Sequence, residues 1–427
     1  MLERSATGND WEAKFDRWLT PFLAAWRHKT RQRWAPAYLR GLLAPGERKS
    51  IEPLAARVSP NSSQQLHHFV AVSKWEVDDI EQVLFDKADA LVGGPNAHLI
   101  VDDTALVKKG RHSVGVAQQY CGQLGKNANC QALVSLTLAR EEVPIPIVLG
   151  LYLPETWAKD GERREAAGVP SEIAFRPKWQ IALDEIRRVI EAGVRFGDVL
   201  ADAGYGACAD FRRGLTTLGL TWAVGVSPDQ LVYPRTVKTK APRSKPGTNG
   251  RPRHTPTVSL TPRKAKDFIA RAGEFETISW RRGTKGRLRA EFAALHVRIA
   301  DGPKVLDHRH GPGDEAWLVC ERRSGGVKKY YLTNHPQDAV LRDVAASIKA
   351  RWSCEQAHQQ MKEELGLDHF EGRSWNGLAH HTLLTMIAFA FLQHLRLQEN
   401  KSPARRSSAP TVVAGRPAST GPAACRA

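Results

Sequence analysis

The stretch His98-Leu-Ile-Val-Asp-Asp-Thr-Ala-Leu106 decides the fold class that this sequence predicts. It is a short apolar run preceded by Gly93-Gly94-Pro95, and these features are typical of a buried β-strand. Two more strands are expected in SVGVAQQYCG (113–122) and NCQALVSLTLA (129–139), joined by turn residues between Gly122 and Asn129. The chain therefore changes near residue 96 from helical spacing to a meander of strands.

The segments that follow this meander alternate between helix and strand. We expect a helix over about Pro177–Ala192, a strand in DVLADAGYG (198–206), a helix in ACADFRRGLTTLG (207–219) and a strand in TWAVGVSP (221–228). A meander followed by helix, strand, helix and strand is an α/β pattern of the ribonuclease-H type. Periodicity alone does not separate this pattern from other mixed α/β folds.

The rest of the chain is assigned by composition around this core. We predict an N-terminal helical domain, with a cationic face suited to DNA, over residues 1–95, although a helix-turn-helix and an ordinary helical bundle look alike here. The core would occupy 96–228 and resume as helices at 338–398, after a β-rich basic insertion over 229–337. Within that insertion, Tyr233–Arg289 carries 16 Lys and Arg against 3 acidic residues, and Ala241–Pro256 is expected to be a mobile loop. The alternative for the insertion is a long solvated loop with edge strands. The tail, 399–427, is expected to be disordered.

The charge and cysteine content narrow the class of protein. Its 427 residues carry a formal net charge of +17, which indicates a polyanionic partner, with nucleic acid first and a merely basic soluble enzyme as the alternative. The six cysteines show no CxxC or zinc-finger spacing, which fits a reducing cytosol. The first ten residues lack an apolar signal core, and no apolar run reaches 18 residues, so we expect a cytoplasmic protein without a membrane span.

Three acids stand at the ends of predicted elements or on a late helix. Asp103 closes the first strand, Asp202 closes the strand taken as the fourth, and Glu355 lies in a predicted helix. In a ribonuclease-H-like sheet the first and fourth strands are neighbours, so these carboxylates would meet beneath the late helix. Three such groups can bind two divalent ions roughly 3.5–4 Å apart, which activate a nucleophile and stabilise the leaving oxygen of a phosphodiester. The alternative is that the aspartates cap turns.

The late helix, Arg351-Trp-Ser-Cys-Glu355-Gln-Ala-His-Gln-Gln-Met-Lys362, has its charges on one stripe. Arg351, Glu355 and Lys362 follow at i, i+4 and i+11, with His358 close to the same stripe. Glu355 could hold a metal while the two cations hold phosphate oxygens. The alternative is an exposed helix with an ordinary Arg–Glu pair.

Four stretches together resemble the DDE transposases of bacterial insertion sequences. They are IVDDTALVKKGRHSVGVAQQYCGQLGKNANCQ, LYLPETWAKDGERREAAGVP, LADAGYG and RWSCEQAHQQMKEELGLDHFEGRSWNGLAHH. The likeness is to the IS-four-type superfamily, in the Tyr-Arg-Glu-Lys branch and its IS-seven-hundred-one-like group, and covers about residues 45–395. In the signature Tyr-x2-Arg-x3-Glu-x6-Lys, the last three positions match Arg351, Glu355 and Lys362, but Ile348 stands at the Tyr position.

The resemblance implies a ribonuclease-H-like core, a β-rich insertion, and Mg²⁺-dependent cleavage and strand transfer of double-stranded DNA. Its implied ligands are two Mg²⁺ ions, for which Mn²⁺ can substitute, held by Asp103, Asp202 and Glu355, and its implied partners are terminal inverted repeats, target DNA and a second copy of the chain in the DNA complex. The family's first acid commonly precedes Thr, which selects Asp103 over the alternative, Asp102. On a strand the two would point to opposite faces.

Two other functions were weighed against this one. An inactive or domesticated DNA-binding copy is disfavoured by the intact acids and Lys362. A metal hydrolase using His308 and His310, or His380 and His381, lacks carboxylate or cysteine ligands at matching spacing. These histidines are therefore expected to be ordinary loop and helix residues.

Overall fold

The structure is a computed structural model that describes residues 8–242, 255–283 and 286–401. Its N-terminal part is helical up to the first strand, as the apolar spacing predicts. The elements are α1 (Gly8–Ala25), α2 (Lys29–Leu43), α3 (Ile51–Val58), α4 (Ser63–His67), a π-helical turn (His68–Val72) and α5 (Asp78–Val92). These helices share one continuous hydrophobic core with α14 (Trp375–Lys401) and the sheet. The secondary structure therefore changes near residue 96, but no separate core begins there.

The central sheet carries the acids. Its strands β1 (His98–Val107), β3 (Lys126–Arg140), β4 (Val143–Tyr152), β5 (Asp198–Ala201) and β6 (Trp222–Val226) lie in the order β4-β3-β1-β5-β6. β1 is antiparallel to β3 but parallel to β5, and Val101 pairs with Ala201. Asp102 and Asp202 therefore follow this pair at the same level of two neighbouring strands. The expectation that the two acid-bearing strands are adjacent is confirmed.

Strand β4 is absent from the strands predicted above, so the number of strands before Asp202 differs from the prediction. β4 contains Pro144 and Pro146, and proline, which has no N–H to donate, speaks against a central strand. β4 pairs only with β3 among the described strands and forms an edge, where proline is tolerated. The meander also includes β2 (Ala117–Cys121), which pairs with the other end of β3. The strand before Asp202 is therefore the fifth along the chain.

The connection between β4 and β5 contains the short helices α6 (Glu155–Ala158) and α7 (Gly161–Ala167). Helices α8 (Lys178–Glu191), α9 (Ala203–Gly206) and α10 (Ala209–Thr217) then flank β5. The observed ends of α8 and α10 are close to the ends predicted from the sequence.

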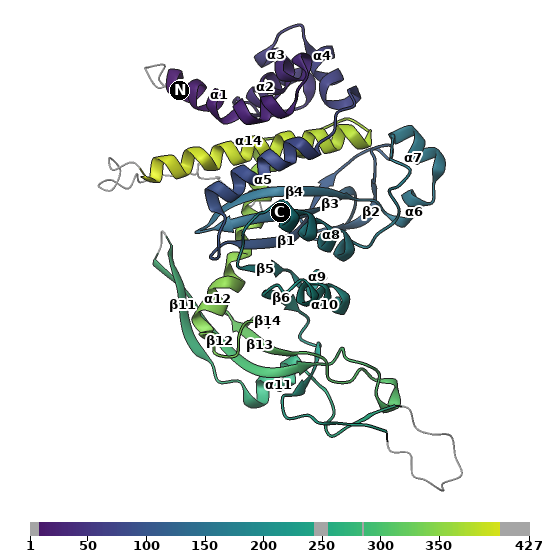
Figure 1. The fold of residues 1–427 in the computed structure, drawn as a ribbon, viewed down its shortest axis with the longest axis vertical. Coiled ribbons are helices and arrows are strands. Elements are labelled where there is room, and N and C mark those ends of the chain that lie inside the picture. The colour runs from purple at the N-terminus through teal and green to yellow at the C-terminus, as the bar shows by residue number, and fades with distance from the viewer. Residues whose placement is uncertain (1–7, 243–254, 284–285, 402–427) are drawn as a thin grey trace, which may run out of the picture.

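The insertion continues the central sheet (Figure 1). β14 (Lys328–Thr333) pairs with β6 and joins β13 (Glu315–Arg322), β12 (Gly286–Ile299), β7 (Leu231–Pro234) and β10 (Arg263–Lys264), while β11 (Glu276–Gly283) pairs with the far end of β12. The insertion also holds β8 (Thr239–Lys240), β9 (Thr257–Val258), α11 (Ala265–Ala272) and a 3-10 turn (Leu306–His308). Most of the predicted loop Ala241–Pro256 lies outside the described residues. The described fold is a mixed α/β architecture built on one large mixed sheet.

Three helices complete the chain. α12 (Leu341–Ala350) leads directly into α13 (Trp352–Glu363), and α14 follows after a short connection. By length and composition α14 could cross a membrane, but most of its apolar segment is buried, and it lies with α5 against the sheet as a core helix (Figure 1). α14 extends to Lys401, so the first three residues of the tail expected to be disordered are helical, and the rest lie outside the described residues.

Candidate active site

A single cavity of about 550 Å³ brings together the acids and the two cations that the sequence assigned to the catalytic site. Its wall contains both adjacent aspartates of β1, the aspartate that follows β5, and the charged stripe of α13: Asp102, Asp103, Asp202, Arg351, Glu355 and Lys362. The remaining lining comes from the same elements and from the turn between β2 and β3. Segments separated by about 100 and 150 residues in the sequence thus meet at one end of β1.

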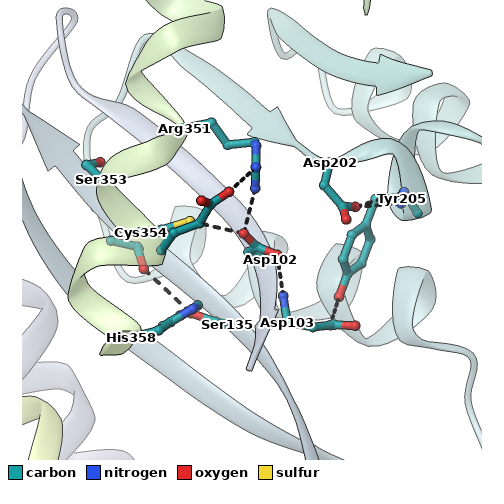
Figure 2. A network of polar contacts seen from close by, with 12 residues as sticks. Asp102, Asp103, Ser135, Asp202, Tyr205, Arg351, Ser353, Cys354 and His358 are labelled. Carbon is teal, nitrogen blue, oxygen red and sulfur yellow. Dashed lines mark hydrogen bonds and ion pairs between the residues drawn. The ribbon is translucent and has the colours of Figure 1, made fainter. Parts of the chain in front are cut away.

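Asp102 faces helix α13 (Figure 2). Its Oδ2 accepts a hydrogen bond from Arg351 Nη1 at 2.6 Å and one from the Cys354 thiol at 3.3 Å. Burial, opposed by the charge of Arg351 and aided by the charge of Asp202, raises the pKa of Asp102 to about 6. Burial also raises the pKa of Cys354, so the thiol stays protonated and donates to the carboxylate.

Asp103 points to the opposite face of β1, as the pleat of a strand requires. Its Oδ2 lies 2.5 Å from Lys178 Nζ at the start of α8, and its Oδ1 accepts from the Tyr205 hydroxyl at 2.6 Å. Burial and the charge of Asp103 raise the pKa of Tyr205, which keeps the phenol protonated as the donor. Asp103 reaches the edge of the cavity, but its side chain is held by α8 and α9 rather than by α13.

Asp202 caps the short helix that follows β5. Its Oδ1 accepts hydrogen bonds from the backbone N–H groups of Gly204 at 2.9 Å and Tyr205 at 3.1 Å. This is the capping role that the alternative interpretation of the sequence gave to such a residue. The cap does not remove Asp202 from the site, because the residue also lines the cavity and its charge acts on Asp102.

Arg351 joins two of the acids. It contacts Asp102 through Nη1 and Glu355 through Nη2, and Glu355 keeps a side chain that is 56% exposed. Burial alone would lower the pKa of Arg351, but the charges of Asp102 and Glu355 raise it, so the guanidinium remains charged. The i,i+4 pair expected on this helix is therefore present, and one of its partners also reaches the sheet.

Lys362 lies at the other end of the stripe. Its Nζ donates to Gln123 Oε1 at 3.2 Å, and burial lowers its pKa. Gln123 belongs to the turn between β2 and β3, so this turn and α13 are in contact where both line the cavity.

His358 fixes α13 to the sheet below the acids. Its Nε2 lies 2.8 Å from Ser135 Oγ, and Ser135 pairs with Asp102 across β1 and β3. Burial lowers the pKa of His358 to about 3, so the ring is neutral at physiological pH. The sequence placed His358 near the stripe but gave it no role, and nothing in the local pattern pointed to Ser135, Tyr205 or Lys178.

Ile348, at the signature Tyr position, is buried in a cluster that also contains Cys354. His380 and His381 are buried as well: His380 stacks on Trp75 at 3.7 Å between ring centroids, and His381 Nδ1 lies 2.9 Å from the Tyr38 hydroxyl. Across the described residues no group of three or more His, Cys, Asp or Glu side chains is arranged to hold a metal ion, and this includes the three acids, two of which are paired with Arg351. His380 and His381 are held within the hydrophobic core and do not line the acid cavity.

A second cavity of about 500 Å³ lies on the insertion, and we call it the arginine groove. It is lined by Ser279, Trp280, Arg281, Arg282, Arg287 and Arg342. Arg281 stacks over Trp352, the first residue of α13, at 5.2 Å and pairs with Glu142. The groove thus adjoins the helix that carries Glu355.

Three comparisons with known proteins bear on this site. The chain is 27% identical over 193 residues to a probable transposase for insertion sequence element IS701 from Microchaete diplosiphon, a match that covers 45% of this chain and only about half, 48%, of that protein. A cryo-EM structure of a piggyBac transposase synaptic complex with hairpin DNA aligns over 92% of this chain and 74% of its own, at 10% identity and a TM-score of 0.44. The family model described as DDE superfamily endonuclease matches residues 21–287, which include Asp102, Asp103 and Asp202. Because this match spans more than half of the 427 residues, the chain belongs to the DDE endonuclease superfamily.

Proposed function

We propose that this protein is a DDE transposase, which cleaves DNA at the ends of an insertion sequence and joins them to target DNA in a metal-dependent reaction. The observation that carries the proposal is the single cavity lined by Asp102, Asp202 and Glu355 together with Arg351 and Lys362. Carboxylates beside two cations suit a site that must hold both metal ions and phosphate. The transposase name of the partial relative agrees with this conclusion.

We further propose that the core is ribonuclease-H-like. The strand order β4-β3-β1-β5-β6, with β1, β5 and β6 parallel and β3 and β4 antiparallel to their neighbours, supports this assignment. In such a core the acids follow two adjacent parallel strands, and a helix from the end of the chain supplies the last acid.

For the first acid we propose Asp102, although the sequence favoured Asp103. Asp102 shares a level with Asp202, whose charge acts on it, and it binds the same guanidinium as Glu355. The carboxylate of Asp103 is engaged by Lys178 and Tyr205 on the other face of β1. Asp103 would then hold the turn that carries Asp202 and not a metal ion.

The donor chemistry of the cavity fits Mg²⁺, with Mn²⁺ as a substitute. Asp102, Asp202 and Glu355 offer carboxylate oxygens, the ligands that hard divalent ions prefer. A cation at these oxygens competes with the guanidinium of Arg351, which already binds two of the three carboxylates. When bound, a pair of divalent ions would activate water or a 3′-hydroxyl and stabilise the leaving oxygen of the phosphodiester.

The chain's own side chains would position the DNA. Arg351 and Lys362 are placed on one helix face to bind phosphates on either side of Glu355. The neutral ring of His358, hydrogen-bonded to Ser135, holds that helix at a fixed distance from β1 and β3. The arginine groove would bind the sugar-phosphate backbone of the terminal inverted repeat. Two such ends require two copies of the chain, so we propose a homodimer in the DNA complex.

Incubation of the purified protein with a plasmid that carries the coding region and its native flanking DNA tests this function. With Mg²⁺ we expect nicks or breaks at the element ends, and none with Asp202→Ala, which should still bind the flanking DNA. If the wild-type protein binds this DNA but cuts it with neither Mg²⁺ nor Mn²⁺, the protein is instead a non-catalytic DNA-binding copy.

A further inference from the structure

A buried carboxylate outside the acid cavity contacts side chains from two other elements. Asp198 begins β5 and is 6% exposed. Its Oδ1 lies 2.6 Å from Nδ1 of His98, which begins β1, and its Oδ2 accepts a hydrogen bond from the hydroxyl of Ser347 on α12. His335 Nε2 stands 3.8 Å from the same Oδ2. One side chain thus connects β1, β5 and α12.

Each of the three elements that Asp198 connects leads to a proposed acid. His98 and Asp198 pair directly across the parallel strands, and each precedes its aspartate, Asp102 or Asp202, by four residues. At about 3.3 Å per residue, that places the contacts roughly 13 Å from the two acids. Ser347 lies on α12, which continues almost directly into α13 and Glu355.

The chemistry of this cluster does not suit a second reaction. The Ser347 hydroxyl donates to the carboxylate and not to an imidazole, and Ser347 is 4% exposed, so it is not an activated nucleophile. His335 is held through Nδ1 by Thr333 Oγ1 at 2.6 Å. Among the residues that the structure describes, these groups also do not form a metal site. What remains is a buried carboxylate whose hydrogen bonds join three elements.

α12 is also bound to the insertion. Glu321 of β13, 1% exposed, accepts from Lys349 Nζ at 2.7 Å, and Lys349 lies 4.9 Å over the ring of Trp280 in the arginine groove. On the core side, Val344 and Ile348 of α12 pack in a cluster with Leu200 of β5, and the bond from Ser347 to Asp198 adds a directional contact to this packing. Because α12 leads directly into α13, its placement on the core sheet sets where Glu355 lies relative to Asp102 and Asp202.

We propose that Asp198 is a positioning residue for DNA cleavage, which holds β1, β5 and α12 together and thereby fixes the spacing of Asp102, Asp202 and Glu355. This inference rests on the proposed function. It assigns Asp198 no contact with DNA or metal. A misplacement of about 1 Å can cost roughly 10²-fold in rate, so the loss of one bond of this cluster should be visible in the chemical step.

The test compares Ser347→Ala, which removes only the bond to α12, with Ser347→Thr, which keeps the hydroxyl. The probe is a duplex made from the DNA that flanks the coding region. At saturating duplex, Ser347→Ala should cleave at least about tenfold more slowly, with an unchanged Kd for the duplex and faster amide hydrogen exchange in Trp352–Glu363. Ser347→Thr should restore most of the rate. Asp198→Asn should resemble Ser347→Ala if it folds, and a double variant of both should lose little more.

The outcomes separate this inference from the proposed function. If folded Ser347→Ala cleaves at the wild-type rate, or loses DNA binding in parallel with cleavage, Asp198 does not position the acids. If the wild-type protein does not cleave, the proposed function fails first, and hydrogen exchange decides the inference alone. Unchanged exchange in α13 of Ser347→Ala would overturn it, because the proposed attachment would then be absent.

Discussion

Replacing each of the two adjacent aspartates by asparagine should separate their roles. Asp102→Asn removes a charge from the group that shares the guanidinium of Arg351 with Glu355. We expect cleavage to fall by roughly 10²–10³-fold, the range found when a group that stabilises developing charge is removed. Asp103→Asn keeps an oxygen that accepts from Tyr205 and loses only the ion pair with Lys178.

The loss of unfolding free energy expected for Asp103→Asn follows from the solvent exposure of the Lys178–Asp103 ion pair. Lys178 and Asp103 side chains are 31% and 33% exposed, so solvent screens them, and the loss should be about 0.5 kcal/mol of unfolding free energy. At roughly 2.1 cal/mol/K of unfolding entropy per residue, such a change in a chain of this size shifts Tm by less than about 1 °C. We expect the cleavage rate of this variant to stay within about tenfold of wild type, because the carbonyl oxygen still holds Tyr205.

Single-turnover cleavage of the flanking-DNA duplex, at saturating protein and with Mg²⁺, measures both variants. Thermal melting and gel-shift titration of the same samples show whether folding and DNA binding are preserved. The reverse result, with Asp103→Asn inactive and Asp102→Asn active, would refute the reasoning from strand faces. The first acid would then be Asp103, as the sequence analysis predicted.

Three further predictions follow from the same geometry. Lys362→Ala should slow cleavage more than about tenfold without altering base preference, because a lone cation positions phosphate and does not read bases. The control Gln123→Ala removes only the hydrogen-bond partner of Lys362 at 3.2 Å and should not slow cleavage. Equal cleavage by Lys362→Ala and wild type would contradict this prediction. In the arginine groove, the slope of log Kd against log salt should fall by about 1 for each of Arg282→Ala, Arg287→Ala and Arg342→Ala. The control Arg187→Ala, on α8, should leave this slope unchanged. Unchanged slopes in the three groove variants would show that the groove is a solvated surface and not a DNA contact. Burial raises the pKa of Asp102 to about 6, so this carboxyl takes up a proton as the pH falls through 6. The affinity for Mg²⁺, measured by calorimetry, should therefore be constant above about pH 6 and weaken about tenfold for each pH unit below it. Asp102→Asn should abolish that dependence, and a flat profile in the wild type would show that Asp102 is not a ligand.

Local periodicity was enough to locate most of the elements that carry the site. The apolar run at His98–Leu106, the spacing in the α8 region and the charged stripe of α13 follow from short-range sterics and the amphipathic pattern of each segment. Local periodicity did not locate β4, whose Pro144 and Pro146 are compatible with an edge strand but not with a central one, and only the assembled sheet shows that β4 is an edge.

The sequence by itself determined that Asp102 and Asp103 face opposite ways, that Asp202 ends a strand, and that Arg351, Glu355 and Lys362 share a helix face. That this strand lies beside β1 is a fact of the assembled sheet. Only the tertiary structure decided which aspartate meets that face, because α13 is set on the sheet by contacts such as His358 with Ser135, which lie 223 residues apart. The same holds for Asp198, whose partners His98 and Ser347 are 100 and 149 residues away. Strand and helix periods arise from neighbouring residues, whereas these bonds depend on how distant segments pack, and no local pattern encodes that packing.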